Sequence, residues 1–178
     1  LAFNGNSDLT DHELSLDADG DITMSGVIAG TASAGFVKRG TGTLWLRGNS
    51  GNTYPGDVYV TEGTLEMSKL AGNAVNGTLF IGTSSGAPGS VVARNLRAEQ
   101  INAVNVSASG LYDLNGLNET VTSLMLLDGA NVQTGSGTLT LAGDVLVWAL
   151  LVADRASTIS GKLDLGTGTR RFSVFNDD

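Results

Sequence analysis

The chain has 178 residues, of which 41% are hydrophobic, 16% are charged, 25 are glycine and none is cysteine. A formal net charge of −8 excludes the basic surface of a nucleic-acid-binding protein, and the lack of cysteine excludes disulfides and thiolate metal sites. No apolar run approaches the roughly 20 residues that a membrane-spanning helix needs, so we expect no transmembrane segment. Abundant glycine between short apolar clusters favours a non-catalytic all-β protein with many tight turns.

The first two predicted strands, residues 14–16 and 22–24, are joined by an acidic turn. Asp17, Asp19 and Asp21 place three carboxylates within five residues, which resembles the start of a calcium-binding loop. The likeness fails at the sixth position, which is Ile22 instead of glycine, and at the twelfth, which is Ile28 instead of glutamate. We therefore expect no cofactor. These three aspartates are the one candidate calcium site, and a solvated corner is the alternative.

A short motif then recurs along the chain, with a glycine, a polar residue and two apolar residues flanking a variable one. Its copies are GTLWL (42–46), GTLEM (63–67), GTLFI (77–81), GTLTL (137–141) and the degenerate GKLDL (161–165). The intervals are irregular but centre on the low twenties. One strand-turn unit of this size cannot bury its apolar side alone, whereas stacked copies can. The pattern therefore predicts a parallel β-helix, or β-solenoid, of about eight rungs.

Within each copy the apolar residues alternate with residues that face outward. If Leu44, Leu65 and Leu79 stack inside the solenoid, then Trp45, Glu66 and Phe80 stack on its surface, and Tyr59 is outward on its own strand. Exposed aromatic rings beside a carboxylate can stack on sugar rings, so these four outward residues are the candidate ligand-binding set. The alternative is an apolar patch that a loop or a neighbouring molecule covers.

The run VLVWALLVA, residues 145–153, is apolar on both faces. A strand buried on both sides would have this composition, and so would a contact surface. Trp148 and Leu150 are therefore the candidate interface residues. A solenoid also has open strand edges at its ends, which invite end-to-end association.

No catalytic site is expected. His12 is the single histidine, and the sequence contains no G-x-S-x-G nucleophile motif. No compact group of acidic and basic residues recurs on adjacent predicted rungs, as a polysaccharide lyase or glycosidase would require.

The block from Gly35 to Met67 resembles the passenger-associated transport repeat of bacterial autotransporters. The matching elements are Lys38, GTGTLWL (40–46), Asn52-Thr53-Tyr54, the alternating residues 58–60 and a second GTL at 63–65. The resemblance implies a right-handed parallel β-helix at the bacterial cell surface or outside the cell, acting as a stalk that displays adhesins or other cargo. The outer-membrane barrel of the full family plan is not found in these residues.

Three functions remain open at this point. The first is a structural or adhesive stalk segment of an autotransporter-like surface protein, with a glycan or another host-surface ligand as partner. The second is a self-assembling subunit of an extracellular fibre or sheath. The third is a polysaccharide-binding or polysaccharide-active β-helix. In each case residues 1–178 are expected to form a single β-solenoid segment, either part of a larger surface protein or a stacking subunit.

Overall fold

The computed structural model describes residues 1–149 and 155–176, and every regular element in these ranges is a β-strand. The strands are β1 (Ala2–Phe3), β2 (Ser7–Asp8), β3 (Leu14–Asp17), β4 (Ile22–Met24), β5 (Ile28–Ala29), β6 (Phe36–Arg39), β7 (Thr43–Gly48), β8 (Val58–Val60), β9 (Thr64–Lys69), β10 (Thr78–Ile81), β11 (Val91–Asn95), β12 (Ala103–Val106), β13 (Gly110–Asp113), β14 (Glu119–Val121), β15 (Ser123–Leu127), β16 (Asn131–Leu141), β17 (Val145–Ala149), β18 (Thr158–Asp164) and β19 (Phe172–Asn176). None of the described segments forms a helix that could cross a membrane.

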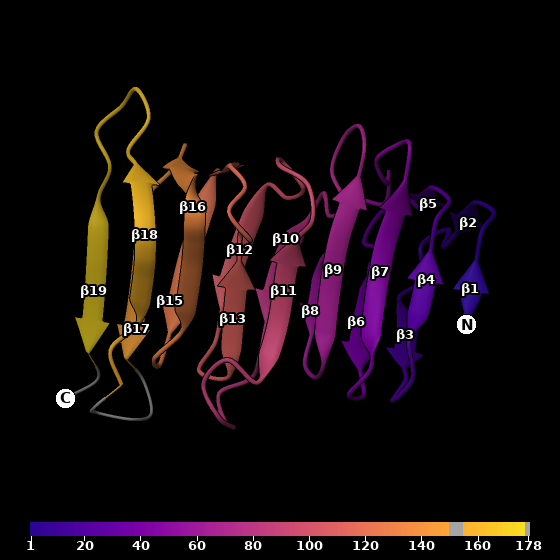
Figure 1. Cartoon of the computed structure of the whole chain (residues 1–178), viewed down its shortest axis with the longest axis horizontal. Helices are drawn as coiled ribbons and strands as arrows, with labels where there is room; N and C mark the ends of the chain where they lie inside the picture. Colours follow the sequence, from indigo (N-terminus) through magenta and orange to yellow (C-terminus); the bar gives the residue numbers. More distant parts are fainter. Residues whose placement is uncertain (150–154, 177–178) are drawn as a thin grey trace.

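Two long parallel sheets form opposite sides of a rod (Figure 1). The front sheet runs β1-β4-β7-β9-β11-β13-β16, and β14 and β18 also pair with β16. The back sheet runs β3-β6-β8-β10-β12-β15-β17-β19. The chain rises along the front sheet, descends along the back sheet and advances by one rung per turn, which is a right-handed winding (Figure 1). The predicted right-handed parallel β-helix of about eight rungs is confirmed.

A third, narrower side joins the end of the front sheet to the start of the back sheet. It begins with the pair β2–β5. Further along, the backbone N–H of Thr53 donates to the carbonyl of Ile28 at 2.9 Å, and that of Ala74 donates to the carbonyl of Gln100 at 2.8 Å. Backbone hydrogen bonds between neighbouring rungs therefore run along the rod on all three sides, and a few turn bonds, such as Ala34 N–H to the carbonyl of Thr31, lie within a rung.

The core is built from inward columns that the strand register aligns. Leu44 pairs with Ile22 on one side and Leu65 on the other in the front sheet, and Phe36 pairs with Val58 in the back sheet. All five side chains belong to one hydrophobic core. The alternation read from the sequence therefore matches the burial, with apolar residues inside and their sequence neighbours outside.

One part of the predicted stacking is wrong. Leu79 does not continue the column of Leu44 and Leu65, because β10 lies in the back sheet and pairs Leu79 with Val58 and Val104. The physical reason is the spacing. The motif copies at 63–67 and 77–81 start only 14 residues apart, less than the 21 that separate Leu44 from its partner Leu65, so the chain reaches the opposite side of the rod.

Tight corners turn the chain from the back sheet into the front sheet. Gly40 and Gly63 occupy equivalent corners with φ of +76° and +67°. A Cβ on Gly63 would lie 2.5 Å from the carbonyl oxygen of Gly42, so this corner requires glycine both for its backbone conformation and for the close approach of the preceding rung.

Candidate functional site

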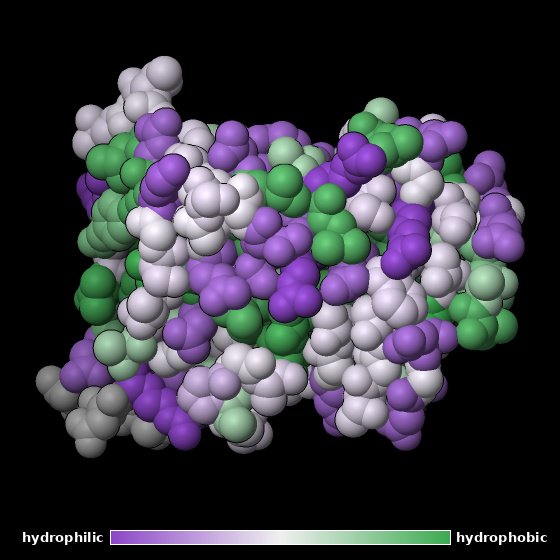
Figure 2. Space-filling view, viewed as in Figure 1, coloured by the Kyte–Doolittle hydropathy of each residue, from purple (hydrophilic) through white to green (hydrophobic). Residues whose placement is uncertain are grey.

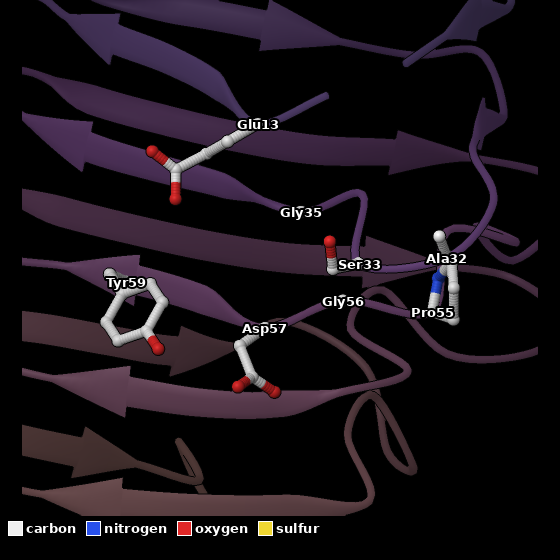
Figure 3. Close-up of a pocket in the computed structure, with 8 residues that line it drawn as sticks. All are labelled: Glu13, Ala32, Ser33, Gly35, Pro55, Gly56, Asp57 and Tyr59. Atoms are coloured by element: carbon white, nitrogen blue, oxygen red, sulfur yellow. The ribbon is translucent and has the colours of Figure 1, made fainter. Parts of the chain in front are cut away.

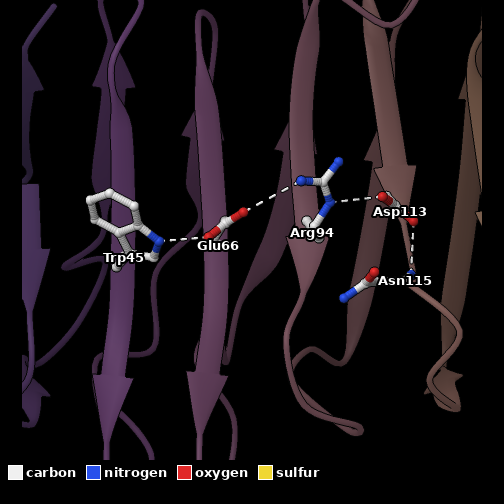
Figure 4. Close-up of polar contacts among 5 residues, drawn as sticks. All are labelled: Trp45, Glu66, Arg94, Asp113 and Asn115. Atoms are coloured by element: carbon white, nitrogen blue, oxygen red, sulfur yellow. Dashed lines mark hydrogen bonds and ion pairs between the residues drawn. The ribbon is translucent and has the colours of Figure 1, made fainter. Parts of the chain in front are cut away.

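The outer surface of the front sheet carries a column of side chains from successive rungs. The register places Trp45 on β7 beside Glu66 on β9, then Arg94 on β11 and Asp113 on β13 (Figure 4). We call these four residues the outward polar column. Two of them, Trp45 and Glu66, were predicted to stack outward, and the structure places them side by side.

Hydrogen bonds connect the whole column. The indole N–H of Trp45 donates to Glu66 Oε2 at 2.5 Å, Arg94 Nη1 lies 3.4 Å from Glu66 Oε1, and Arg94 Nε donates to Asp113 Oδ2 at 2.8 Å. Burial raises the pKa of Asp113, but hydrogen bonds from Arg94 and Asn115 outweigh it, so the net pKa is lowered. The hydrogen bond to Asp113 is the main reason that the pKa of Arg94 is raised.

The side chains of this column are already engaged in contacts with one another and with Arg47. The guanidinium of Arg47 lies 4.9 Å from the centroid of the Trp45 ring, and the Glu66 carboxylate already accepts two hydrogen bonds. Figure 2 shows this side of the molecule with hydrophilic and hydrophobic residues interspersed along the rod. Trp45 and Glu66 therefore link rungs to one another.

Tyr59 and Phe80, the other two predicted ligand residues, lie on the back sheet. They pair across β8 and β10, and their rings stack with centroids 4.6 Å apart and planes 13° apart. Tyr59 is 37% exposed. The four candidate residues therefore fall into two pairs on opposite sheets, and of their three aromatic residues Tyr59 is exposed whereas Trp45 and Phe80 are half-buried.

A hollow of about 460 Å³ lies beside Tyr59, where the third side turns into the back sheet. Figure 3 shows Glu13 and Asp57 on strands to either side of Gly35, with Ser33, Ala32 and Pro55 along the adjoining corner. Sequence reasoning missed this hollow, because its walls come from three different rungs.

A second hollow, of about 500 Å³, lies at the opposite corner. It is lined mainly by hydroxyl side chains, namely Thr41, Thr61, Thr83, Ser85, Ser90 and Ser109, together with Glu62, Gly63 and Val91. Glu62 Oε2 accepts the backbone N–H of Gly40 at 2.9 Å, so its carboxylate supports the corner.

Two aspartates of the candidate calcium turn accept hydrogen bonds from the next rung. Asp19 Oδ1 accepts the backbone N–H and the hydroxyl of Thr41, at 3.0 and 3.1 Å, and Asp21 Oδ1 accepts the backbone N–H of Thr43 at 3.0 Å. The hydrogen bonds from Thr41 lower the pKa of Asp19. Asp17 is exposed. In residues 1–149 and 155–176, no three His, Cys, Asp or Glu side chains are arranged to hold a metal ion.

Trp148, one of the two candidate interface residues, stacks on Phe175 of β19. The ring centroids are 4.6 Å apart and the planes are inclined by 23°. Leu150, the other candidate, lies outside the described residues.

A buried polar network, which the sequence did not reveal, closes the corner after β11. The carboxylate of Glu119 accepts the backbone N–H groups of Gln100 and Ile101 and the side-chain amide of Asn95. Burial raises the pKa of Glu119 to about 7, against the effect of these backbone donors. The side chain of Gln100 in turn accepts the backbone N–H of Lys69 at 2.8 Å.

Buried lysines support two other corners. Lys38 Nζ donates to the carbonyls of Arg39 and Gly40, at 3.0 and 2.6 Å, and Lys69 Nζ donates to the carbonyl of Gly26 at 2.7 Å. Burial lowers the pKa of both lysines, to about 8 for Lys69. A lysine on an inward position of a predicted strand is the signal that could have found them, because a charged residue enters a core only with partners.

Comparison with known proteins identifies the repeat. The family model described as Passenger-associated-transport-repeat matches residues 36–67 and 132–145. The chain is also similar to the Adhesin BmaC autotransporter of Brucella suis biovar 1 (strain 1330), with 29% identity over 159 residues that cover 85% of this chain. The chain spans only 4% of the length of that protein. No solved structure matches the chain significantly.

The first match begins at the start of β6 and ends within β9. The repeat therefore corresponds to one full turn of the solenoid and the start of the next, including the corner at Gly63 and the buried Lys38 and Tyr54. The resemblance seen in the sequence is confirmed.

Proposed function

We propose that the chain, which matches the passenger-associated transport repeat, is a rigid, non-enzymatic rod segment of an adhesin-like protein on the bacterial surface. The repeat and the adhesin relative imply export to the cell surface or the extracellular space. On this proposal the solenoid holds its outward side chains at fixed spacing, so that they contact the surface to which the cell adheres.

The observation that carries this proposal is the unbroken ladder of parallel strands around a satisfied core. Strand pairing continues through both long sheets, and no buried side-chain nitrogen or oxygen in the described part of the chain lacks a hydrogen-bond partner. A rod of this kind resists local opening, because each rung is paired with its neighbours on all sides. Such stiffness suits a spacer and display element.

Beads coated with the purified chain test the proposal directly. We expect them to adhere to cultured epithelial cells and the chain to resist limited proteolysis. The control is a Leu65→Asp variant, which places a charge in the core and destroys the rod. This variant should neither adhere to the cells nor resist proteolysis. Equal adhesion by the two proteins, or none by the folded chain, would overturn the adhesive proposal.

The second candidate function is a self-assembling subunit, and the charges of the first and last described rungs favour it. Residues 1–21 contain six acidic residues and no Lys or Arg, whereas Arg155, Lys162, Arg170 and Arg171, together with the acidic Asp164, lie in or around β18 and β19. Head-to-tail stacking of copies would bring these opposite charges together.

Sedimentation velocity at low and high salt tests this second candidate. Stacking predicts concentration-dependent assembly that weakens as salt screens the charged ends. A chain that stays monomeric at high concentration in low salt would rule it out.

A further inference from the structure

We infer that the hollow beside Tyr59 is a binding site for a saccharide that carries no negative charge. The inference deepens the proposed adhesive function and rests on it, since it names the class of ligand that the rod would contact. The argument starts from the register of the first three rungs of the back sheet.

The register places Glu13, Gly35 and Asp57 next to one another on three successive rungs. Leu14 pairs with Phe36, and Phe36 pairs with Val58, so the residues that precede them form a column of their own. Neighbouring strands lie about 4.8 Å apart, which puts Glu13 and Asp57 roughly 10 Å apart along the rod. The position between them is Gly35, so no side chain of the middle rung separates the two acidic residues.

The floor of the hollow is formed where neighbouring rungs approach closely at two glycines. A Cβ on Gly35 would lie 2.1 Å from the carbonyl oxygen of Asp57, and one on Gly56 would lie 2.3 Å from the carbonyl oxygen of Ser33. Only glycine fits at these two positions, because the backbone of a neighbouring rung occupies the place of a side chain. The hollow of about 460 Å³ beside them has a backbone floor and side-chain walls (Figure 3).

One wall of the hollow is aromatic and well supported. Tyr59 lines the hollow, is 37% exposed, and stacks on Phe80 with ring centroids 4.6 Å apart. Because Phe80 supports the ring, little side-chain freedom is lost when a ligand packs against it. An aromatic surface of this kind binds the C–H face of a sugar ring through apolar contact.

The polar walls provide oxygen acceptors. Asp57 Oδ1 accepts the backbone N–H of Thr78 at 2.7 Å, so this carboxylate is held towards the following rung, on the side away from Glu13 (Figure 3). Glu13 and Ser33 are exposed on the opposite side and along the corner. Carboxylates are strong acceptors for hydroxyl groups, so a ring with several hydroxyls can bind across the gap.

The charge of the lining decides which saccharides fit. Among the described residues that line the hollow there are two carboxylates and no Lys, Arg or His. A uronate or sialate would meet like charge on both sides, whereas a neutral or amine-bearing sugar would not. The hydroxyl-lined hollow at the opposite corner has no aromatic side chain among its lining residues and is the weaker candidate.

An immobilised panel of oligosaccharides tests the site with the purified chain. The panel carries glucose-, galactose-, mannose- and N-acetylglucosamine-terminated chains, with sialylated and glucuronate-containing counterparts. We expect binding to at least one uncharged saccharide and none to the anionic ones. The tightest saccharide is then titrated by calorimetry.

Two variants probe the two kinds of wall. Tyr59→Leu should weaken binding about tenfold by removing the aromatic surface, and the double variant Glu13→Gln with Asp57→Asn should weaken it about tenfold by removing both charged acceptors. The matched controls are Asp17→Asn, an exposed acid on the same strand region, and Phe175→Leu, an exposed aromatic residue at the far end. Both controls should bind the saccharide as tightly as the parent chain.

Circular dichroism checks the fold of each variant. If Tyr59→Leu does not fold, the double variant Glu13→Gln with Asp57→Asn still tests the site.

The inference is overturned if no uncharged saccharide binds, if the anionic ones bind instead, or if both site variants bind as tightly as the parent. The bead assay separates this failure from that of the proposed function. Adhesion that persists in Tyr59→Leu and in the double variant would leave the rod proposal standing and remove the saccharide site. If the folded parent chain does not adhere at all, both the adhesive function and the saccharide site are contradicted.

Discussion

The backbone N–H of Gln100 donates to both oxygens of the Glu119 carboxylate, at 3.0 and 2.9 Å, and so ties two neighbouring rungs together inside the solenoid. Glu119 is fully buried. A carboxylate in this position both completes the hydrogen bonds of a corner and makes the stability of the rod sensitive to pH.

The first prediction follows from the sign of that sensitivity. Burial raises the pKa of Glu119 from an ordinary 4.5 to about 7, so between these values the folded chain binds a proton that the unfolded chain does not. The contribution of Glu119 to the free energy of unfolding should therefore fall as pH rises from 4.5 to 7, by on the order of 3 kcal/mol, and stay constant above that range. Urea unfolding at pH 5, 6, 7 and 8 measures this slope.

Glu119→Gln isolates the contribution of this one group. A glutamine keeps an oxygen to accept the N–H groups of Gln100 and Ile101 but has no proton to exchange, so the slope between pH 5 and 7 should flatten. Glu13→Gln, at an exposed position on the surface, should keep the slope of the parent chain. A parent chain whose stability rises from pH 5 to 7 would contradict the prediction.

The second prediction concerns Arg94 in the outward polar column. Its replacement by methionine removes the 2.8 Å hydrogen bond to Asp113, whose side chain is only 7% exposed. The Arg94 side chain is 37% exposed, so solvent screens part of the interaction, and we expect a loss of about 1 kcal/mol in the free energy of unfolding.

A double-mutant cycle with Asp113→Asn separates the pair from other effects of each change. The double variant Arg94→Met with Asp113→Asn should be more stable than the sum of the two single losses predicts. Strict additivity would show that the two side chains do not stabilise one another. Because the hydrogen bonds lower the pKa of Asp113, the contribution of the pair should also disappear as pH falls through that lowered pKa.

Much of the fold could be predicted because every rung of a solenoid uses the same alternation of inward apolar and outward residues. The motif copies at 42–46 and 63–67 are one turn apart, and their alternating residues assign the inward and outward sides correctly. The predicted position of the copy at 77–81 is wrong because the motif does not indicate which side of the rod a strand occupies. The length of the intervening chain indicates the side, and before this copy that length is shorter than a full turn.

The site was harder to predict, because it depends on how rungs align. Tyr59 and Phe80 were recognised as outward aromatic residues, but their stacking follows from the pairing of β8 with β10. Glu13 and Asp57 are far apart in sequence and resemble ordinary surface acids. Their place on either side of Gly35 becomes visible only when the register of three rungs is known.

The third prediction concerns the corner at Gly63. Gly63→Ala places a side chain on a residue with φ of +67° and brings its Cβ to 2.5 Å from the carbonyl oxygen of Gly42, so we expect a loss of about 2–3 kcal/mol. Gly20→Ala is the matched control, because an added Cβ there meets nothing within 4 Å, and its effect should stay within about 0.5 kcal/mol. Thermal unfolding followed by circular dichroism compares the two, and equal effects would mean that the corner tolerates a shift of the preceding rung.

The fourth prediction tests whether the inward column carries the stability of the rod. Leu65 is fully buried and lies between Leu44 and Ala93 of the neighbouring rungs, so Leu65→Ala leaves a cavity that both rungs border and should cost about 2–5 kcal/mol. Leu70, just beyond the same strand, is 54% exposed, and Leu70→Ala should change stability by about 0.5 kcal/mol or less.

Urea unfolding also shows how this loss spreads along the rod. Each rung contacts only its neighbours, so a weakened central rung should lower the unfolding midpoint and can divide the transition into two, whereas a change at Leu70 should leave a single transition. Hydrogen exchange would then show the faster opening concentrated in β7, β9 and β11, the strands that border the cavity. Similar losses for Leu65→Ala and Leu70→Ala would show that the stacked inward leucines are not what stabilises the solenoid.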